Sequence, residues 1–197
     1  MQRRIRRAAR RDDGTHTGLI AIAPHGGDIE AYTEAERVTS QLAGKGVSSW
    51  RCKGWHPKGA FDHWHITSTD IHEASFPLLN SVISRGFKHA VAFHGFDDPN
   101  IPHDILIGGL VPEALKEEVK EAIEGVVGSD FTVHITKPGE QFGGGDPRNI
   151  VNRLTAGGGN GIQIEQKKGP REKYARPIAD AVANVYDSEL GLRTICR

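Results

Sequence analysis

The chain has 197 residues, of which 37% are hydrophobic and 25% charged, and its formal net charge is zero. This composition is typical of a globular domain that can bury its own core, which argues against intrinsic disorder. Two cysteines cannot form a disulfide framework, and no apolar run approaches the roughly 18 residues of a membrane span.

The charge is unevenly distributed along the chain. Six arginines lie within the first eleven residues, so the rest of the chain has 19 basic and 25 acidic residues. We expect residues 1–17 to form a basic N-terminal arm and residues 18–197 to form one domain. Such an arm could contact a polyanion, although a solvated terminus is the commoner outcome. No apolar signal-peptide core follows the arginines, so we expect a cytoplasmic protein that lysis would release.

Hydrophobic periodicity predicts strands that alternate with helices along the rest of the chain. Short apolar or alternating runs predict strands at 19–23, 47–52, 63–68, 89–93, 104–110, 131–136 and 161–166. Apolar residues at helical spacing predict helices between Thr33 and Gly44 and at 76–85, 112–127 and 170–190. The first of these helices would start at a capping box formed by Thr33 and Glu36. This alternation predicts a single-domain α/β layer fold with a mixed sheet.

Two of the predicted strands lead into the dipeptide His-Gly. The strand at 19–23 leads to His25, and the strand at 89–93 leads to His94. If the two strands are parallel neighbours, both histidines lie at the carboxyl edge of the sheet, where open α/β sheets place their sites. Glu30 follows His25 across two glycines that permit a tight turn, and it would complete a set of two histidines and one carboxylate.

Such a set is typical of catalytic zinc, which has three protein ligands and keeps a fourth position for water. The alternative for the segment around His25 is a strand-to-helix turn with a polar rim. Asp28 is a weaker candidate for a role in the same turn. His89 lies on the same predicted strand as His94, but five residues apart on a strand the two point to opposite faces. His94, at the strand end, is the better candidate.

A zinc hydrolase also needs a carboxylate that moves protons without binding the metal. Glu165 is the candidate, because the alternation of its strand places Ile162 and Ile164 on the other face. An exposed glutamate at a strand edge is the alternative. His63 and His65 share one face of their predicted strand and could form a second metal site or a proton relay, although packed or surface histidines are commoner.

Taken together, these segments resemble the phage-type poly-γ-glutamate hydrolases, which are compact relatives of the zinc carboxypeptidases. The resemblance covers about residues 18–186 and is carried by His-Gly-Gly-Asp-Ile-Glu at 25–30, Trp-His-Ile-Thr-Ser at 64–68, Phe-His-Gly at 93–95, Asn152-Arg153 and Gly-Ile-Gln-Ile-Glu at 161–165. It implies an open twisted sheet with helices on both faces, one zinc ion and hydrolysis of γ-linked glutamyl amide bonds. By position, it implies that His25, Glu30 and His94 bind zinc and that Glu165 is the general base.

A poly-γ-glutamate substrate carries a free carboxylate on every residue, so its enzyme needs cations along the cleft. Arginine pairs with carboxylates bidentately, and our candidates are Arg148 and Arg153, which lie in the glycine-rich region. A second basic cluster follows Glu165, for which a solvated surface is an equally good interpretation. Its members are Lys167, Lys168, Arg171, Lys173 and Arg176.

Two alternatives to this function remain open. The first keeps the zinc site but takes a peptide, another amide or an aminoacyl ester as its substrate. The second is a non-catalytic protein that associates with nucleic acid through its arginine-rich arm. We favour an anionic amide polymer as the partner, give nucleic acid less weight, and expect no membrane partner.

Overall fold

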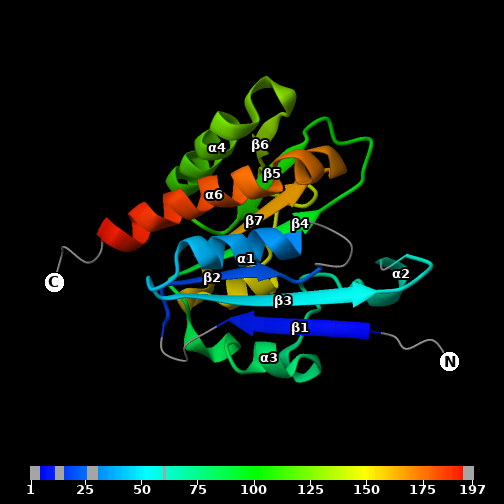
Figure 1. Cartoon of the computed structure of the whole chain (residues 1–197), viewed down its shortest axis with the longest axis vertical. Coiled ribbons are helices and arrows are strands. Elements are labelled where there is room, and N and C mark those ends of the chain that lie inside the picture. Colours follow the sequence, from blue (N-terminus) through cyan, green and yellow to red (C-terminus); the bar gives the residue numbers. More distant parts are fainter. Residues whose placement is uncertain (1–4, 12–15, 26–30, 60, 193–197) are drawn as a thin grey trace.

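The structure is a computed structural model of the chain, and it describes residues 5–11, 16–25, 31–59 and 61–192. Within these residues, seven strands form one mixed sheet in the order β1-β3-β2-β4-β7-β5-β6 (Figure 1). The strands are β1 (Ile5–Arg11), β2 (Leu19–Ala23), β3 (Val47–Trp55), β4 (His89–Gly95), β5 (Ile105–Gly109), β6 (Val133–Ile135) and β7 (Gly161–Gln166). β3, β2, β4 and β7 run parallel, whereas β1 is antiparallel to β3 and β5 is antiparallel to β7.

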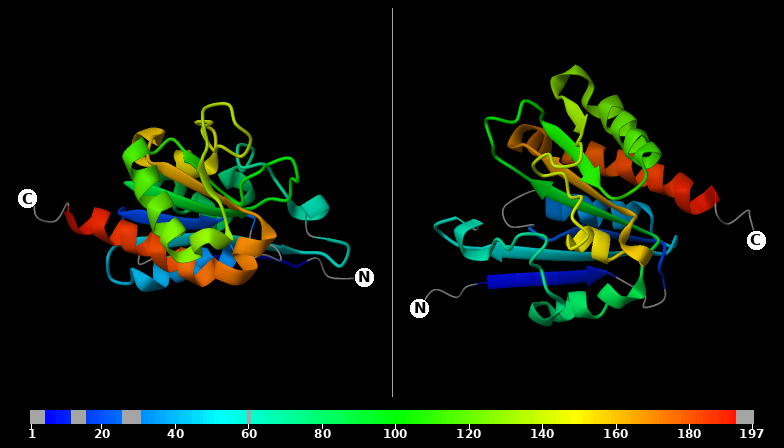
Figure 2. Two further views of the ribbon diagram at one scale, coloured as in Figure 1. Left: turned by 90° about the horizontal axis from the view of Figure 1, so that it is seen from above. Right: turned by 180° about the vertical axis from the view of Figure 1, so that it is seen from behind.

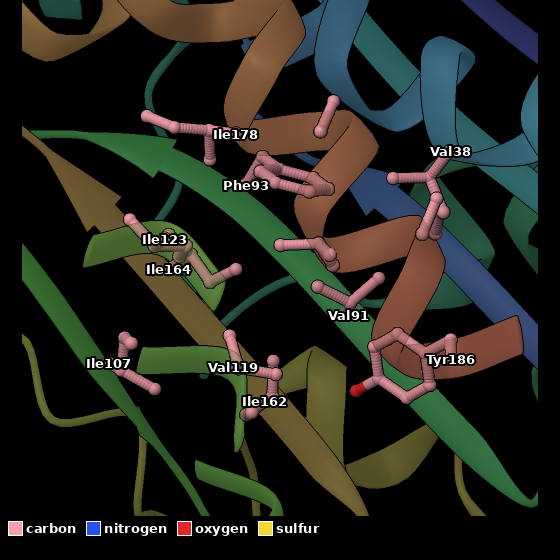
Figure 3. Close-up of a cluster of buried hydrophobic side chains, with 14 of the residues drawn as sticks. Val38, Val91, Phe93, Ile107, Val119, Ile123, Ile162, Ile164, Ile178 and Tyr186 are labelled. Atoms are coloured by element: carbon pink, nitrogen blue, oxygen red, sulfur yellow. The ribbon is translucent and has the colours of Figure 1, made fainter. Parts of the chain in front are cut away.

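Three long helices cover one face of this sheet (Figure 1). They are α1 (Ala31–Gln41), α4 (Glu113–Val127) and α6 (Lys168–Leu192). Figure 3 shows part of the core between these helices and the sheet, in which Phe93 of β4 and Ile164 of β7 belong to the same cluster as Ile178 of α6. All three side chains are fully buried, and each such burial contributes about 1.5–3 kcal/mol to stability. Because side chains alternate along a strand, every second residue of β4 and β7 points away from these helices, toward the opposite face of the sheet.

Short helices cover the opposite face, which the right-hand view of Figure 2 shows from behind. The short helical segments of the described residues are α2 (Phe61–Trp64), α3 (Pro77–Asn80), α5 (Ile150–Arg153) and four 3₁₀ turns at Glu73–Ser75, Ile83–Arg85, Gly128–Asp130 and Ala156–Gly158. In the core of this face, Trp50 of β3 meets the Phe76 ring edge-on, with ring centres 5.4 Å apart. The prediction of a mixed sheet with helices on both faces is confirmed.

One predicted strand is wrong. The segment predicted as a strand at 63–68 instead starts within α2, whose helical turn is closed by a hydrogen bond from the His65 N–H to the Phe61 carbonyl (3.0 Å). Trp64 packs closely on Gly54 of β3, where a Cβ would lie 2.5 Å from the Trp64 ring. The aromatic and β-branched residues of this segment favour a strand, but Trp64 packs against β3, which lies between β1 and β2, and this contact is compatible with a helical turn.

Two further boundaries differ from the predictions. The predicted helix at 76–85 is broken into α3 and a 3₁₀ turn, and Gly86 ends this region with a φ of 64°. α1 starts at Ala31, so Thr33 lies inside the helix and does not cap its start. Residues 5–11, which belong to the basic N-terminal segment, pair with β3 as the edge strand β1. No helix among the described residues is both long and apolar enough to cross a membrane.

Candidate metal and acid–base site

The site is built at the carboxyl ends of three neighbouring strands. β2, β4 and β7 lie side by side and run parallel, so their carboxyl ends meet at one edge of the sheet. His25 follows β2, His94 lies near the end of β4, and Glu165 is the residue of β7 that pairs in register with His94. The condition stated for the two His-Gly strands, that they are parallel neighbours, is met.

His25 and His94 face each other through their Nδ1 atoms, which are 3.0 Å apart. The Nε2–H of His25 donates to the main-chain carbonyl of Ile66 (2.5 Å), so the Nδ1 atom of the neutral ring keeps its lone pair. Burial lowers the pKa of His25 to about 4. Burial also lowers the pKa of His94 well below its ordinary value, and the neighbouring His25 and His65 add to this effect. Both rings are therefore neutral near pH 7, which is the form that binds metals.

The arrangement of these two histidines fits a zinc ion. Two nitrogens bound at about 2.0–2.1 Å to a tetrahedral zinc ion are separated by about 3.3 Å, close to the separation observed between the Nδ1 atoms. The Ile66 carbonyl, which accepts from Nε2 of His25, is the kind of partner that orients a metal-bound imidazole. Glu30 and Asp28 lie outside the described residues, so their predicted roles stay predictions. The part of the chain that is described contains no group of three His, Cys, Asp or Glu residues that could hold a metal.

His89 is separated from this site by the sheet, as its position on β4 predicts. Its ring lies 5.7 Å from that of Tyr186 in α6, on the face covered by the long helices. His94 lies five residues further along the same strand and lines the cavity described below. Of the two histidines on β4, only His94 is therefore placed to act with His25.

Glu165 is a buried carboxyl group beside the histidine pair. Its Oε1 atom is 3.9 Å from Nδ1 of His94, and burial raises the pKa of Glu165 to about 8, against an opposing effect of the positive charge of Arg171. The Nε2 amide of Gln163 donates to the same Oε1 (3.0 Å). Sequence reasoning missed Gln163, although residues two apart on a strand share a face, and this spacing could have revealed it.

A cavity of about 1260 Å³ opens over these residues, with His25, His94 and Glu165 in its wall. It is larger than the 300–1,000 Å³ that is usual for small-ligand pockets. Phe61 and His65 stack against each other at its wall, with ring centres 4.4 Å apart, and the His65 ring lies 4.6 Å from that of His25. His65 is therefore a wall residue of the cavity, and burial lowers its pKa. His63, in α2, is not among the residues that line the cavity.

The two arginines predicted to bind substrate lie outside the cavity wall. Arg148 is exposed and forms an ion pair with Asp146 (2.7 Å). Arg153 pairs with Glu73 (2.6 Å) and donates to the carbonyl of Ile71 (2.7 Å). Their roles with substrate stay predictions. From the basic cluster after Glu165, it is Arg171 that lines the cavity.

Comparisons with known proteins agree with this architecture. The family model for poly-gamma-glutamate hydrolase matches residues 5–182. The structure of a bacteriophage poly-gamma-glutamate hydrolase matches with a TM-score of 0.72 and 24% identity, over 95% of this chain and 90% of that chain. Zinc-free YNDL matches with a TM-score of 0.70 and 20% identity, over 93% of this chain and 90% of that chain.

A further structure has a more distant likeness. N-acetylmuramoyl-L-alanine amidase AmiC2 of Nostoc punctiforme matches with a TM-score of 0.51 and 16% identity, over 90% of this chain and 99% of that chain. A comparison with curated proteins finds no match. At these identities, the solved structures support the fold.

Proposed function

The chain belongs to the poly-gamma-glutamate hydrolase family, and on this premise we propose that it hydrolyses the γ-glutamyl amide bonds of poly-γ-glutamate with the help of one zinc ion. The observation that carries the proposal is the convergence of His25, His94 and Glu165 from three adjacent parallel strands in the wall of one large cavity. The size of this cavity suits a polymer better than a single small ligand.

We assign the zinc ligands to His25, His94 and Glu30. The first two are supported by the separation of their Nδ1 atoms and by their neutral state. The assignment of Glu30 rests on its position in the His-Gly-Gly-Asp-Ile-Glu segment. When zinc is bound at such a site, it polarises the scissile carbonyl and makes water more acidic.

Glu165 would take the proton from the attacking water and deliver it to the leaving amine. The raised pKa of the metal-free carboxyl supports this role, because it brings the pKa close to neutral pH, where one group can both accept and return a proton. Gln163 holds one oxygen of this carboxyl. It is the same oxygen that lies 3.9 Å from Nδ1 of His94, so this hydrogen bond holds the carboxyl group against the histidine pair.

The test measures the size of high-molecular-weight poly-γ-glutamate after incubation with the purified protein, with and without a zinc chelator. We expect shortening that the chelator abolishes and added zinc restores. Glu165→Gln should keep its zinc and lose activity by roughly 10²- to 10⁴-fold, which is the usual contribution of general acid–base catalysis. His94→Ala should lose zinc and activity together.

Three other outcomes would contradict parts of the proposal. If the protein binds stoichiometric zinc but does not shorten the polymer, the zinc site would stand and its substrate would be another amide or ester. If the protein still shortens the polymer after the chelator has removed its zinc, the metal takes no part in the reaction. Full activity of Glu165→Gln would remove Glu165 from its role as the general base.

A further inference from the structure

Three successive glycines, Gly143 to Gly145, form part of the cavity wall. The carbonyl of Gly143 accepts a hydrogen bond from the N–H of Gly109 (2.7 Å). The carbonyl of Gly144 accepts one from Nδ2 of Asn152 (2.8 Å), whose side chain is fully buried. These two bonds fix the orientation of the peptide groups that join the three glycines.

The same two peptide groups direct their N–H groups to the opposite side. In a trans peptide the C=O and N–H bonds point in opposite directions, and none of the described peptide bonds is cis. The N–H of Gly144 therefore points away from Gly109, and the N–H of Gly145 points away from Asn152. Neither N–H has a hydrogen-bond acceptor among the described residues, and both glycines are at least partly exposed in the cavity wall. The wall thus presents two successive main-chain donors.

These donors lie next to the group proposed as the general base. Nε2 of Gln163 donates to Oε1 of Glu165 (3.0 Å) and also to the carbonyl of Phe142 (3.1 Å), which directly precedes the glycines. A Cβ at Gly144 would lie 2.9 Å from Cβ of Gln163, so the main chain of Gly144 packs directly on that side chain. A group held by the two donors would therefore lie close to the reacting bond.

Two donors in this arrangement are suited to a carboxylate. Successive main-chain N–H groups around a residue in the left-handed conformation form a concave site that binds anions, and Gly144 has a φ of 63°. Glycine adopts this conformation without strain. Each donor can meet one oxygen of a carboxylate, and a hydrogen bond to an ionised acceptor is about twice as strong as one to a neutral acceptor. The loop can therefore distinguish a carboxylate from a neutral group.

We propose that the N–H groups of Gly144 and Gly145 bind the free α-carboxylate of a glutamyl unit that flanks the scissile bond, and so favour an anionic γ-linked chain over a neutral one. In a γ-linked chain, each α-carboxylate stays close to an amide bond of the backbone, so donors beside the reacting groups can contact it. The inference rests on the proposed function and adds a specificity-determining element to it.

The test removes one donor and keeps the rest of the loop. Gly145→Pro replaces the N–H by a ring that lies opposite the carbonyl held by Asn152, whereas Gly145→Ala keeps the N–H and is the matched control. Gly145 does not have a positive φ, and a Cβ there would meet no described atom within 4 Å.

The assay compares two substrates of equal length: a γ-linked glutamate oligomer, and the same oligomer with its α-carboxylates converted to carboxamides. kcat and KM are measured for both with the zinc-loaded wild-type protein and the two variants. Melting temperature and zinc content are measured for each protein.

The wild-type protein should prefer the carboxylate oligomer. On this substrate Gly145→Pro should raise KM roughly 10- to 100-fold, which corresponds to the loss of one hydrogen bond to a charged group. Its kcat should stay within about twofold of the wild type, because the contact is made equally in the ground state and the transition state. On the carboxamide oligomer the same variant should change KM by less than about threefold. Gly145→Ala should behave as the wild type on both substrates.

An equal rise in KM on both substrates, the same rise in Gly145→Ala, or equal kcat/KM of the wild-type protein on both oligomers would refute the inference. If Gly145→Pro does not fold, the amide NMR signals of Gly144 and Gly145 decide, measured in Glu165→Gln so that turnover is slow. These signals should shift with the carboxylate oligomer and much less with the carboxamide oligomer; shifts with neither, or equal shifts with both, would overturn the proposal. A wild-type protein that cleaves neither the oligomers nor the polymer would refute the proposed function itself, and the inference with it.

Discussion

Gln163 links Glu165, the proposed general base, to two other residues by hydrogen bonds. Removing the Gln163 amide tests whether this network positions Glu165 for catalysis. Its Nε2 donates to Glu165 Oε1 (3.0 Å) and to the carbonyl of Phe142 (3.1 Å), and its Oε1 accepts from Asn149 Nδ2 (2.8 Å). The side chains of Asn149, Gln163 and Glu165 are all buried. We predict that Gln163→Leu, which keeps a side chain of similar size, slows the reaction and destabilises the fold.

The magnitudes follow from the bonds that are lost. The ionised form of Glu165 is the one that accepts a proton, and a hydrogen bond to a charged group contributes about 1.5–3 kcal/mol. Losing the donor to this form should therefore lower kcat roughly 10- to 100-fold. A buried polar group left without its partner costs about 1–3 kcal/mol. The substitution leaves the buried Asn149 amide in that state, so the free energy of unfolding should fall by about 1–3 kcal/mol.

The assay measures kcat, KM and zinc content well below the melting temperature, together with urea unfolding. Asn149→Ala is the matched control, because it breaks the outer end of the network while Gln163 still donates to Glu165. We expect the control to lose stability but to retain most of kcat. If Gln163→Leu keeps kcat within about twofold of the wild type, or if Asn149→Ala loses as much, the hydrogen bond to Glu165 does not support catalysis.

Three further predictions concern stability. Arg37 holds the pKa of Asp180 below its ordinary value. The resulting stabilisation is present above about pH 4 and is lost as the pH falls through the pKa of the folded state. Asp180→Asn should therefore make the free energy of unfolding, measured with urea, depend less on pH in this acid range. Gly108→Ala should cost about 3 kcal/mol or more, because its Cβ would lie 2.0 Å from the Gly143 carbonyl oxygen. Arg153→Ala should lower the unfolding free energy by about 1 kcal/mol, through loss of its ion pair and its carbonyl contact.

Each of these has an outcome that would contradict it. An unchanged acid limb in the Asp180 variant would mean that other carboxylates dominate acid unfolding. A wild-type melting temperature in the Gly108 variant would mean that the glycine-rich loop moves aside without cost. A rise in KM without loss of stability in the Arg153 variant would instead support the predicted role of this arginine with substrate.

Local patterns were sufficient to predict the central strands and the faces of their residues. The apolar run at Leu19–Ala23 matches β2, because a strand buried on both faces is apolar throughout. The alternation at Gly161–Gln166 matches β7, because side chains on a strand point alternately to its two faces. The same period correctly separated Glu165 from its apolar neighbours and His94 from His89. It did not predict the short helix α2, where packing of Trp64 on Gly54 accompanies a helical turn despite the strand propensity.

The chemistry of the site was thus encoded locally, but its assembly was not. The residue types of His25, His94 and Glu165, and their positions at strand ends, are properties of the sequence alone. That β2, β4 and β7 are neighbours is decided by the packing of the whole sheet, because strand order depends on contacts between residues far apart in the chain. For the same reason, only the tertiary structure could show that Arg153 is paired outside the cavity wall while Arg171 lies within it.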